Sequence, residues 1–502
     1  MKKIWHNLPL ILLIVFIAIY SIYFSLFTIN RYQKLYAHYY DLGIMHHTVY
    51  NTYKALQTGD MSRILELTNP HSFSADQVKR MSIHNDILLA FFAPFYFIHE
   101  GPETLLVLQA VGVAVGAFFI YKITNNVFKD VKYRAWIGLV FGLVYLLYPP
   151  LQKANSFEFH AVTFVTTIFL AMFYFWLVKR YVLSFFFVIL ALLTKEQVGL
   201  TVAAFGVFIL VDKYKYFSLK QIARTLPKFK SDPALTFAVS IIIIGVIWVI
   251  LSVFVIIPLA RGQWHFASGY YDHIIKAPWK IPYFLTKHYV IKYMFDLLGP
   301  VGFLSVAAPL QLLIAAPEFA INLLSSNSNM RNIYFHYDTV ITAFVFISMI
   351  YGVKNITGFV EKIYEKARLY MLIILLTLTG ATSLIFSFTS STLPYARLRD
   401  IYPWKKPQDK YEDIIYWKKM LDQDQIKVST TGHLAPHFTS RQYFYDFSWK
   451  YVYADYLVLD RHDARYGYLK KSSLSAYKAL QVDPDYIKIY DRNGIEVYKK
   501  SP

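Results

Sequence analysis

Long apolar runs alternate with short polar connections through the first 390 residues of the chain. A bilayer core of about 30 Å needs roughly 20 apolar residues per helix, and fewer where a helix is short or sheltered. By that criterion the pattern predicts about eleven transmembrane helices. Their approximate ranges are 8–29, 103–122, 134–150, 159–178, 181–194, 197–212, 236–258, 291–304, 305–323, 338–352 and 368–390. The predicted fold class is therefore an α-helical polytopic membrane protein.

The basic residues follow this pattern of spans. If the N-terminus is cytoplasmic, every connection expected on the inner side carries several Lys or Arg residues, in the ranges 122–134, 179–180, 213–230 and 354–368. The short outer connections at 149–158 and 194–196 carry one Lys each. This asymmetry agrees with the positive-inside rule and predicts a multi-pass protein of the plasma membrane with a cytoplasmic N-terminus.

Three segments then lie on the outer face, namely a loop at about 30–85, a loop at about 259–290 and a tail from about 391 to the end. We expect a transmembrane domain at 1–390 and a small soluble, extracytoplasmic α/β domain at 391–502. Strands are predicted at 426–430 and 456–460, and a hairpin at 486–490 and 495–498 around Asn493-Gly494, because this dipeptide favours the positive φ of a tight turn. Helices are predicted at 411–421 and 469–480.

Composition removes several classes of protein. The 502 residues are 56% hydrophobic, 18% aromatic and only 17% charged, which excludes a soluble enzyme and a disordered chain. The absence of cysteine excludes disulfides, thiolate nucleophiles and Cys-ligated metal centres. The net charge of +19 is largely explained by the inner loops, so we expect no nucleic acid as a partner.

Ionisable residues close to the hydrocarbon are costly, and here they gather at the outer ends of the predicted spans. The first is Asp41, about a dozen residues beyond the first span and among aromatic neighbours. Burial would raise its pKa towards working pH, as a general base requires. The alternative is an N-cap of an amphipathic helix at about 44–56.

Two further pairs share one side of an extended chain. His84 and Asp86 could bind a metal or share a proton, although capping by Asn85 or Asp86 explains them equally well. Glu158 and His160 lie among phenylalanines, where an interfacial aromatic anchor explains the aromatic residues but not the Glu and the His.

The last two clusters carry cations. Lys195 and Glu196 occupy a tight outer turn, where Lys195 could neutralise a phosphate or the pair could simply be solvated. Arg331, His336 and Tyr337 precede the span at 338–352, and a solvated loop explains Arg331 better than it explains the other two. No spacing in the sequence compels a metal site, so a divalent metal is compatible with the sequence but not required by it.

In the order Tyr40-Asp41-Leu42-Gly43-Ile44, His84-Asn85-Asp86, Phe157-Glu158-Phe159-His160, Lys195-Glu196 and His336-Tyr337-Asp338, the chain resembles a family of prokaryotic integral membrane proteins known as domain of unknown function 2079. The likeness extends to Leu434-Ala435-Pro436-His437, Arg441 and residues 455–460 in the tail. The layout is similar to that of the GT-C glycosyltransferases, which have a first span, a long outer loop that begins with an acidic residue, further spans and a soluble outer domain.

That resemblance implies transfer of a sugar from a polyprenyl-phosphate donor to a cell-envelope acceptor on the outer face, with Asp41 as the acidic residue of the first outer loop at the catalytic centre, where it would deprotonate the acceptor hydroxyl. GT-C members often pair two acidic residues there, whereas Leu42 and Gly43 follow Asp41, so a metal, Asp86 or Glu158 would have to assist. The expected phosphate ligands are Lys195, Arg331 and His336, and Glu158 and His160 would orient the donor or the acceptor.

Two other functions are compatible with the sequence. A transporter or flippase of a lipid-linked or charged solute would use the ionisable residues as a pathway, but it needs polar residues on both sides of the membrane. A non-catalytic envelope protein whose tail binds cell-wall polymer would not depend on Asp41.

Overall fold

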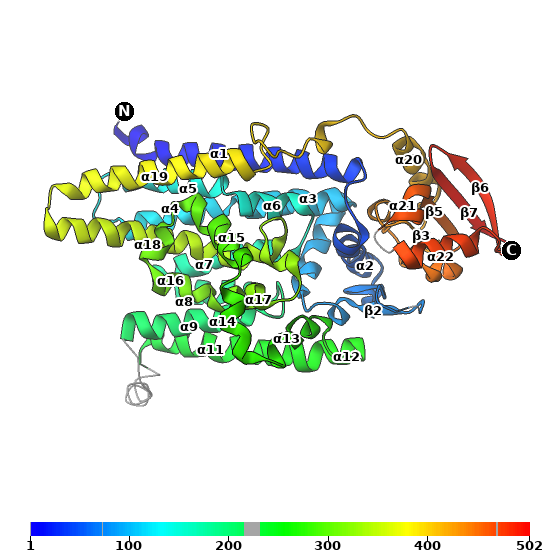
Figure 1. Cartoon of the computed structure of the whole chain (residues 1–502), viewed down its shortest axis with the longest axis horizontal. Coiled ribbons are helices and arrows are strands. Elements are labelled where there is room, and N and C mark those ends of the chain that lie inside the picture. The colour runs from blue at the N-terminus through cyan, green and yellow to red at the C-terminus, as the bar shows by residue number, and fades with distance from the viewer. Residues whose placement is uncertain (1, 73, 215–230, 468–469) are drawn as a thin grey trace.

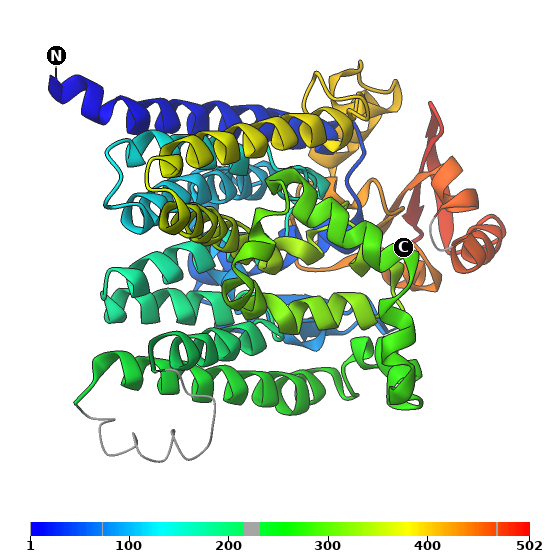
Figure 2. The same ribbon diagram turned by 60° about the vertical axis from the view of Figure 1, so that its left-hand side comes forward.

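The structure is a computed structural model that describes residues 2–72, 74–214, 231–467 and 470–502. Part of the basic inner loop expected at 213–230, and residue 469 at the start of an expected helix, lie outside the described residues. The described chain is mostly helical, with a small sheet near the C-terminus. Figures 1 and 2 show the long helices running side by side, with this sheet beyond one end of the bundle.

Within the described residues, five helical stretches are long and apolar enough to cross a membrane. They are α1 (Lys2–Gln33), α3 with α4 (Pro102–Ala114 and Gly116–Val127), α11 with α12 (Pro233–Leu251 and Ile257–Arg261), α18 (Thr339–Ile363) and α19 (Ala367–Ser390). A sixth stretch consists of α5 (Arg134–Leu146) and α6 (Pro149–Phe157), which meet at 46°. The bend falls at Pro149-Pro150, where a continuous helix would lose backbone hydrogen bonds.

The other predicted spans form shorter helices. Three of them are α7 (Val165–Leu177), α8 (Tyr181–Leu192) and α9 (Val198–Tyr214). The expected number of eleven transmembrane helices therefore stays a prediction, because five or six of the described stretches meet the length criterion.

The region at 291–323 differs from the two continuous helices that the sequence predicts. It contains α15 (His288–Leu298), α16 (Pro309–Leu312) and α17 (Ala316–Leu324), joined by short 3-10 turns. The first of these helices ends at Leu298, directly before Gly299-Pro300, and Gly302 and Phe303 both adopt positive φ. Pro309 and Pro317 start new helices, so the backbone chemistry breaks an otherwise apolar run.

The first outer loop is largely structured. After α1, a five-residue π-helical turn, Tyr39–Gly43, leads directly into α2 (Ile44–Thr58), which ends at Gly59 with φ +80°. An antiparallel pair of short strands follows, β1 (Glu66–Thr68) and β2 (Gln77–Lys79). In the second outer loop, α13 (Asp272–Ile275) and α14 (Ile281–Leu285) are short.

The C-terminal sheet has five strands in the order β4-β3-β5-β7-β6. They are β3 (Val428–Thr430), β4 (Phe444–Asp446), β5 (Tyr456–Asp460), β6 (Tyr486–Arg492) and β7 (Ile495–Lys500), with helices α20 (Lys410–Met420), α21 (Arg461–Tyr466) and α22 (Lys470–Leu480). The predicted hairpin is confirmed, since Asn493 and Gly494 both adopt positive φ between β6 and β7. Strand β4 was not predicted.

The hydrophobic core of this sheet includes part of the first outer loop. Leu35, Tyr39 and Ile44 are buried in the same cluster as Val428, Phe444 and other tail residues. The segment that carries Asp41 therefore packs against the helical bundle on one side and the C-terminal sheet on the other.

Candidate functional site

A cavity of about 440 Å³ lies at one end of the helical bundle, between the ends of the helices and the two loops that the sequence places on the outer face. All of the sequence-predicted site residues line it except Glu158 and Arg331. The residues that the sequence predicted and that share this cavity are Asp41, His84, Asp86, His160, Lys195, Glu196, His336 and Tyr337. Its wall is formed by segments that are far apart in the sequence, from Tyr40 to Tyr337, so folding of the whole bundle is required to form it.

Asp41 reaches the cavity from the π-helical turn. Its Oδ1 lies 3.0 Å from Nε2 of His160, which is 6% exposed, whereas the Asp41 side chain is 28% exposed. The His160 ring in turn stacks on the ring of His336 with centroids 3.8 Å apart. Among the described residues, Oδ2 of Asp41 has no hydrogen-bond partner, so this oxygen is available to a hydroxyl in the cavity.

The alternative reading of Asp41 as a helix cap is wrong. The residue that precedes α2 is Gly43, which makes no side-chain cap, and α2 continues the π-helical turn without a break in helical φ and ψ. Asp41 therefore sits inside the turn, where its side chain is left to His160 and the cavity.

Glu158 lies behind this turn rather than on the cavity wall. Its Oε2 accepts hydrogen bonds from the backbone N–H of Leu42 at 2.8 Å and of His38 at 3.2 Å, and Oε1 lies 3.1 Å from the same N of His38. Burial, with a further contribution from the Asp41 carboxylate, raises the pKa of Glu158 well above its usual value. Glu158 and His160 thus hold the backbone and the side chain of the Asp41 turn, respectively.

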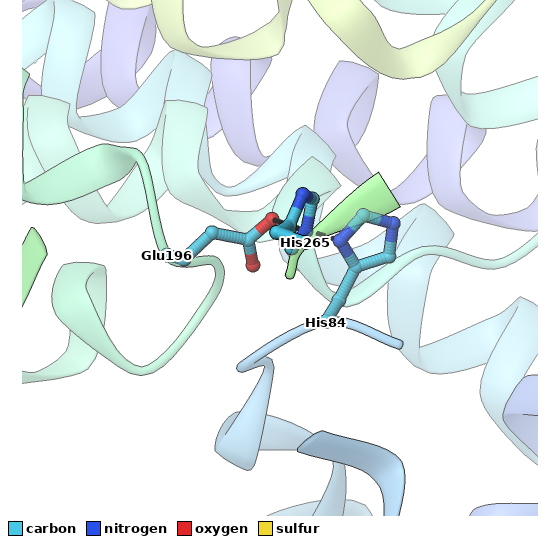
Figure 3. A group of neighbouring side chains, drawn as sticks. All are labelled: His84, Glu196 and His265. Atoms are coloured by element: carbon cyan, nitrogen blue, oxygen red, sulfur yellow. Dashed lines mark hydrogen bonds and ion pairs between the residues drawn. The ribbon is translucent and has the colours of Figure 1, made fainter. Parts of the chain in front are cut away.

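Figure 3 shows His84, Glu196 and His265 turned toward one another from three different segments. Oε1 of Glu196 lies 2.8 Å from Nδ1 of His84 and 3.3 Å from Nε2 of His265. Burial alone would raise the pKa of Glu196, but His84, His265 and Lys195 together lower it well below its usual value. Burial lowers the pKa of His84 to about 4. His84 is therefore neutral, and the ionised carboxylate of Glu196 accepts a hydrogen bond from its imidazole.

The three ligand atoms lie within 4.8 Å of one another, which is close enough for a shared metal ion. However, Nδ1 of His265 accepts the backbone N–H of Ala267 at 3.1 Å. A neutral imidazole has one proton, which must then be on Nε2, the atom that a metal would need with a free lone pair. This tautomer disfavours His265 as a metal ligand, and within the described residues its buried Nε2 makes no hydrogen bond to Glu196, although the two atoms lie 3.3 Å apart.

Asp86 does not pair with His84. Both of its oxygens accept from Arg80, with Nε to Oδ1 and Nη2 to Oδ2 each at 2.8 Å, and both side chains are buried. The predicted His84/Asp86 pair is therefore wrong, and so is capping by Asp86, which makes no side-chain cap to the following helical segment.

Lys195 is the predicted cation that faces the cavity. Its Nζ lies 5.7 Å from the centroid of the Tyr337 ring, and within the described ranges it has no carboxylate within 4.0 Å. A cation on an aromatic face keeps its charge available to an anionic ligand.

Arg331 points elsewhere. Its Nη1 donates to the backbone carbonyl of Ser325, and its guanidinium lies 4.2 Å from the ring centroid of Tyr289. The sequence placed Arg331 at the cavity rim, but the loop at 325–332 folds back on itself through Asn327 and Ser325 and turns this side chain away.

The sequence analysis missed two histidines and one arginine of the cavity wall, His71, His265 and Arg80. His265 lies in the second outer loop, where no cluster of charges marked it. Only the fold brings it within 3.3 Å of Glu196, a residue 69 positions earlier (265 minus 196).

Comparison of the whole structure with solved structures gives the fold. ArnT from Cupriavidus metallidurans, solved with bound undecaprenyl phosphate, superposes with a TM-score of 0.54 over 98% of each chain at 9% sequence identity. No curated protein matches the sequence. The profile of a family of predicted membrane proteins, DUF2079, matches residues 31–497. The chain therefore belongs to the DUF2079 family of predicted membrane proteins, as its ordered motifs indicate.

Proposed function

We propose that this protein is a membrane-embedded glycosyltransferase that moves a sugar from a polyprenyl-phosphate donor to an acceptor hydroxyl. The observation that carries the proposal is the Asp41 carboxylate on the wall of a cavity that also holds the ammonium group of Lys195. A base and a phosphate-binding cation in one cavity are the two groups that this reaction needs.

In the proposed reaction, Oδ2 of Asp41 takes the proton of the acceptor hydroxyl. The hydroxyl oxygen forms a bond to the anomeric carbon of the donor sugar at the same time. The bond from that carbon to the phosphate oxygen breaks, and the electron pair leaves with the polyprenyl phosphate. Lys195 stabilises the negative charge of the leaving phosphate, and His336 and Tyr337 complete this wall of the cavity. His160 orients Asp41, and Arg331 is not part of the site because it does not reach the cavity.

The lipid partner is supported by the fold. ArnT shares this fold and was solved with bound undecaprenyl phosphate. Because a polyprenyl chain is apolar, we expect it to reach the cavity from within the bilayer. Many exposed apolar side chains on α1, α11 and α19 provide a surface for the surrounding lipid.

The proposed orientation is that of a multi-pass protein of the plasma membrane. The N-terminus is cytoplasmic, and the cavity, the outer loops and the domain at 391–502 are extracytoplasmic, where they meet a cell-envelope acceptor. The charge asymmetry of the connecting loops supports this orientation.

The proposal is tested by transfer of radiolabelled sugar from a mixed pool of polyprenyl-phosphate sugars, with the purified protein in lipid. Wild type is compared with Asp41→Asn and with Asp76→Asn, which changes an exposed aspartate of the same outer loop. We expect Asp41→Asn to lose about 10²-fold or more of the rate and Asp76→Asn to keep it.

Equal transfer by Asp41→Asn and wild type would remove Asp41 as the base. If no donor in the pool supports transfer by wild type, the transporter or flippase hypothesis takes precedence, and lipid translocation is then measured in the same vesicles.

A further inference from the structure

The C-terminal sheet contacts the backbone that leads into Asp41. The N–H of Tyr39 donates to the carbonyl of Gly432 at 3.0 Å, and Nδ1 of His433 lies 3.3 Å from the carbonyl of Ala37. These residues follow β3, so the loop at the end of one strand runs beside the outer loop of the helical bundle. The Tyr39 ring also packs on Phe444 of β4, with centroids 5.0 Å apart.

Gly432 is required by space and not by backbone conformation. Its φ lies outside the left-handed region, so other residues can adopt this backbone. A Cβ atom at this position would lie 2.1 Å from Nε2 of His38 and 2.6 Å from Cε1 of the same ring. Any side chain at position 432 therefore forces the His38 ring to move.

His38 cannot move freely, because it is held from the other side as well. Its backbone N–H donates to the Glu158 carboxylate, and its Nδ1 accepts the N–H of Tyr40 at 3.4 Å. The His38 ring also meets the His433 ring edge to face, with centroids 5.0 Å apart. A displacement of the His38 ring would therefore shift the backbone of Tyr40, and with it the position of Asp41.

Tyr40 lies between two cavities at this contact. Tyr40 lines both the main cavity and a pocket of about 30 Å³ between His38, Gly432, His433 and Asp446. Asp446 is half-buried and accepts a hydrogen bond from Tyr40. The turn that presents Asp41 is accordingly built from both parts of the molecule, and neither part alone defines it.

We propose that Gly432 is a positioning residue that sets the place of the Asp41 turn, so that the C-terminal sheet controls the geometry of a site in the helical bundle. The structural half of this proposal stands on the contacts at Gly432, and its catalytic half rests on the proposed glycosyltransferase function. No residue of the sheet touches the reacting groups in this scheme; the effect passes through His38.

The test compares Gly432→Ala with Gly380→Ala, a helical glycine with nothing within 4 Å of its added Cβ atom. Hydrogen exchange of the Tyr39 amide reports the contact without any activity, since this amide donates to Gly432. We expect exchange at residues 38–42 to be at least about tenfold faster in Gly432→Ala and unchanged in Gly380→Ala. In the transfer assay, kcat should fall about 10- to 100-fold with little change in the KM of the donor.

A double variant separates positioning from a general loss of structure. His38→Ala removes the ring that the new methyl group would meet, so the Gly432→Ala change should have no further effect on exchange or kcat in a His38→Ala background. This rescue also keeps the test valid if Gly432→Ala alone does not fold, since the double variant should then fold.

Wild-type exchange in Gly432→Ala, or losses that multiply in the double variant, would overturn the proposal, as would a double variant that does not fold when His38→Ala does. If wild type transfers no sugar, the glycosyltransferase proposal fails, and the exchange measurements still decide whether Gly432 holds the turn.

Discussion

His160 and Asp41 are 119 residues apart in the sequence, yet Nε2 of His160 lies 3.0 Å from Oδ1 of Asp41. The contact joins the first outer loop to the segment between α6 and α7. It fixes one carboxylate oxygen of Asp41 and leaves the other toward the cavity, which is the arrangement of a positioned base.

Removal of this contact should slow transfer without preventing folding. We expect His160→Ala to lower kcat about 10- to 100-fold, because Asp41 then samples other rotamers, while the donor KM changes little. His160→Gln, which keeps an N–H donor, should recover part of the rate. His99→Ala changes a histidine with 62% of its side chain exposed and serves as the control. Equal rates for all three variants would show that the contact has no role in transfer.

Variants of Glu158 can show whether the fold needs a negative charge at this position or only a hydrogen-bond acceptor. Its carboxylate accepts the backbone N–H groups of His38 and Leu42, and burial raises its pKa. We therefore expect Glu158→Gln to stay close to wild type in thermal stability. Glu158→Ala leaves buried donors unpaired and should cost about 1–3 kcal/mol for each.

Thermal unfolding of both variants in one detergent checks this expectation, with the exposed Glu412→Ala as the control. A Gln variant as unstable as the Ala variant would contradict it and indicate that Glu158 acts as an ionised group.

We expect the group of His84, Glu196 and His265 not to bind a metal ion. Because Nδ1 of His265 is occupied by the N–H of Ala267, we expect no stoichiometric metal in protein purified from metal-supplemented medium. Added Zn²⁺ should not raise the melting temperature, since only a ligand that binds the folded state does so. A zinc-dependent rise in wild type that is absent in His265→Ala would refute this reading and establish a metal site.

Much of the helical pattern could be predicted from the sequence, and eight of the ten residues predicted for the site line one cavity. Apolar runs between basic connections marked the helices, and buried ionisable residues at their outer ends marked the cavity, because both features follow from the cost of polar groups in lipid. The interruption at Gly299-Pro300 was also visible. Residues Pro309 and Pro317 broke the run further, which hydropathy alone does not indicate.

The partners within the site could not be predicted. His84 and Asp86 are two residues apart, but they do not contact the same residue. Asp86 pairs with Arg80, and His84 pairs with Glu196. Likewise, nothing local marked His265 or turned Arg331 away from the cavity. These outcomes depend on long-range packing, for which the spacing of residues along one segment carries no information.

Membrane orientation can be measured directly because the chain has no cysteine. We expect Val482→Cys, at a position with 83% exposure in the C-terminal region, to react with a membrane-impermeant maleimide added to intact cells. Glu365→Cys, in the connection between α18 and α19, should react only after the cells are permeabilised. The reverse pattern would place the cavity on the inner side and exclude an extracytoplasmic acceptor.

Acid should loosen the contact between the C-terminal sheet and the first outer loop. Burial lowers the pKa of His38 and His47 to about 4 and of His437 to about 3, and all three lie at this contact. Below an unfolded pKa of about 6.5, the unfolded chain binds protons that the folded one does not. These three neutral histidines therefore cost no stability above about pH 6.5, and the free energy of unfolding falls as the pH drops from about 6.5 to 4.

Each of these histidines can change the stability by up to about 1.4 kcal/mol per pH unit in that window. Asp446 and Glu158 act in the opposite direction, because burial raises the pKa of Asp446 to about 7 and that of Glu158 well above its usual value, and their contribution is lost as the pH rises. Three histidines outweigh these two carboxyl groups, so stability should decrease on acidification. Thermal unfolding at pH 7 and pH 5 measures the loss, which should be smaller in His437→Gln, where an N–H donor for the carbonyl of Tyr32 is kept without the titration. His99→Gln should behave as wild type, and a stability that does not change between pH 7 and pH 5 would show that these histidines are not held neutral by the fold.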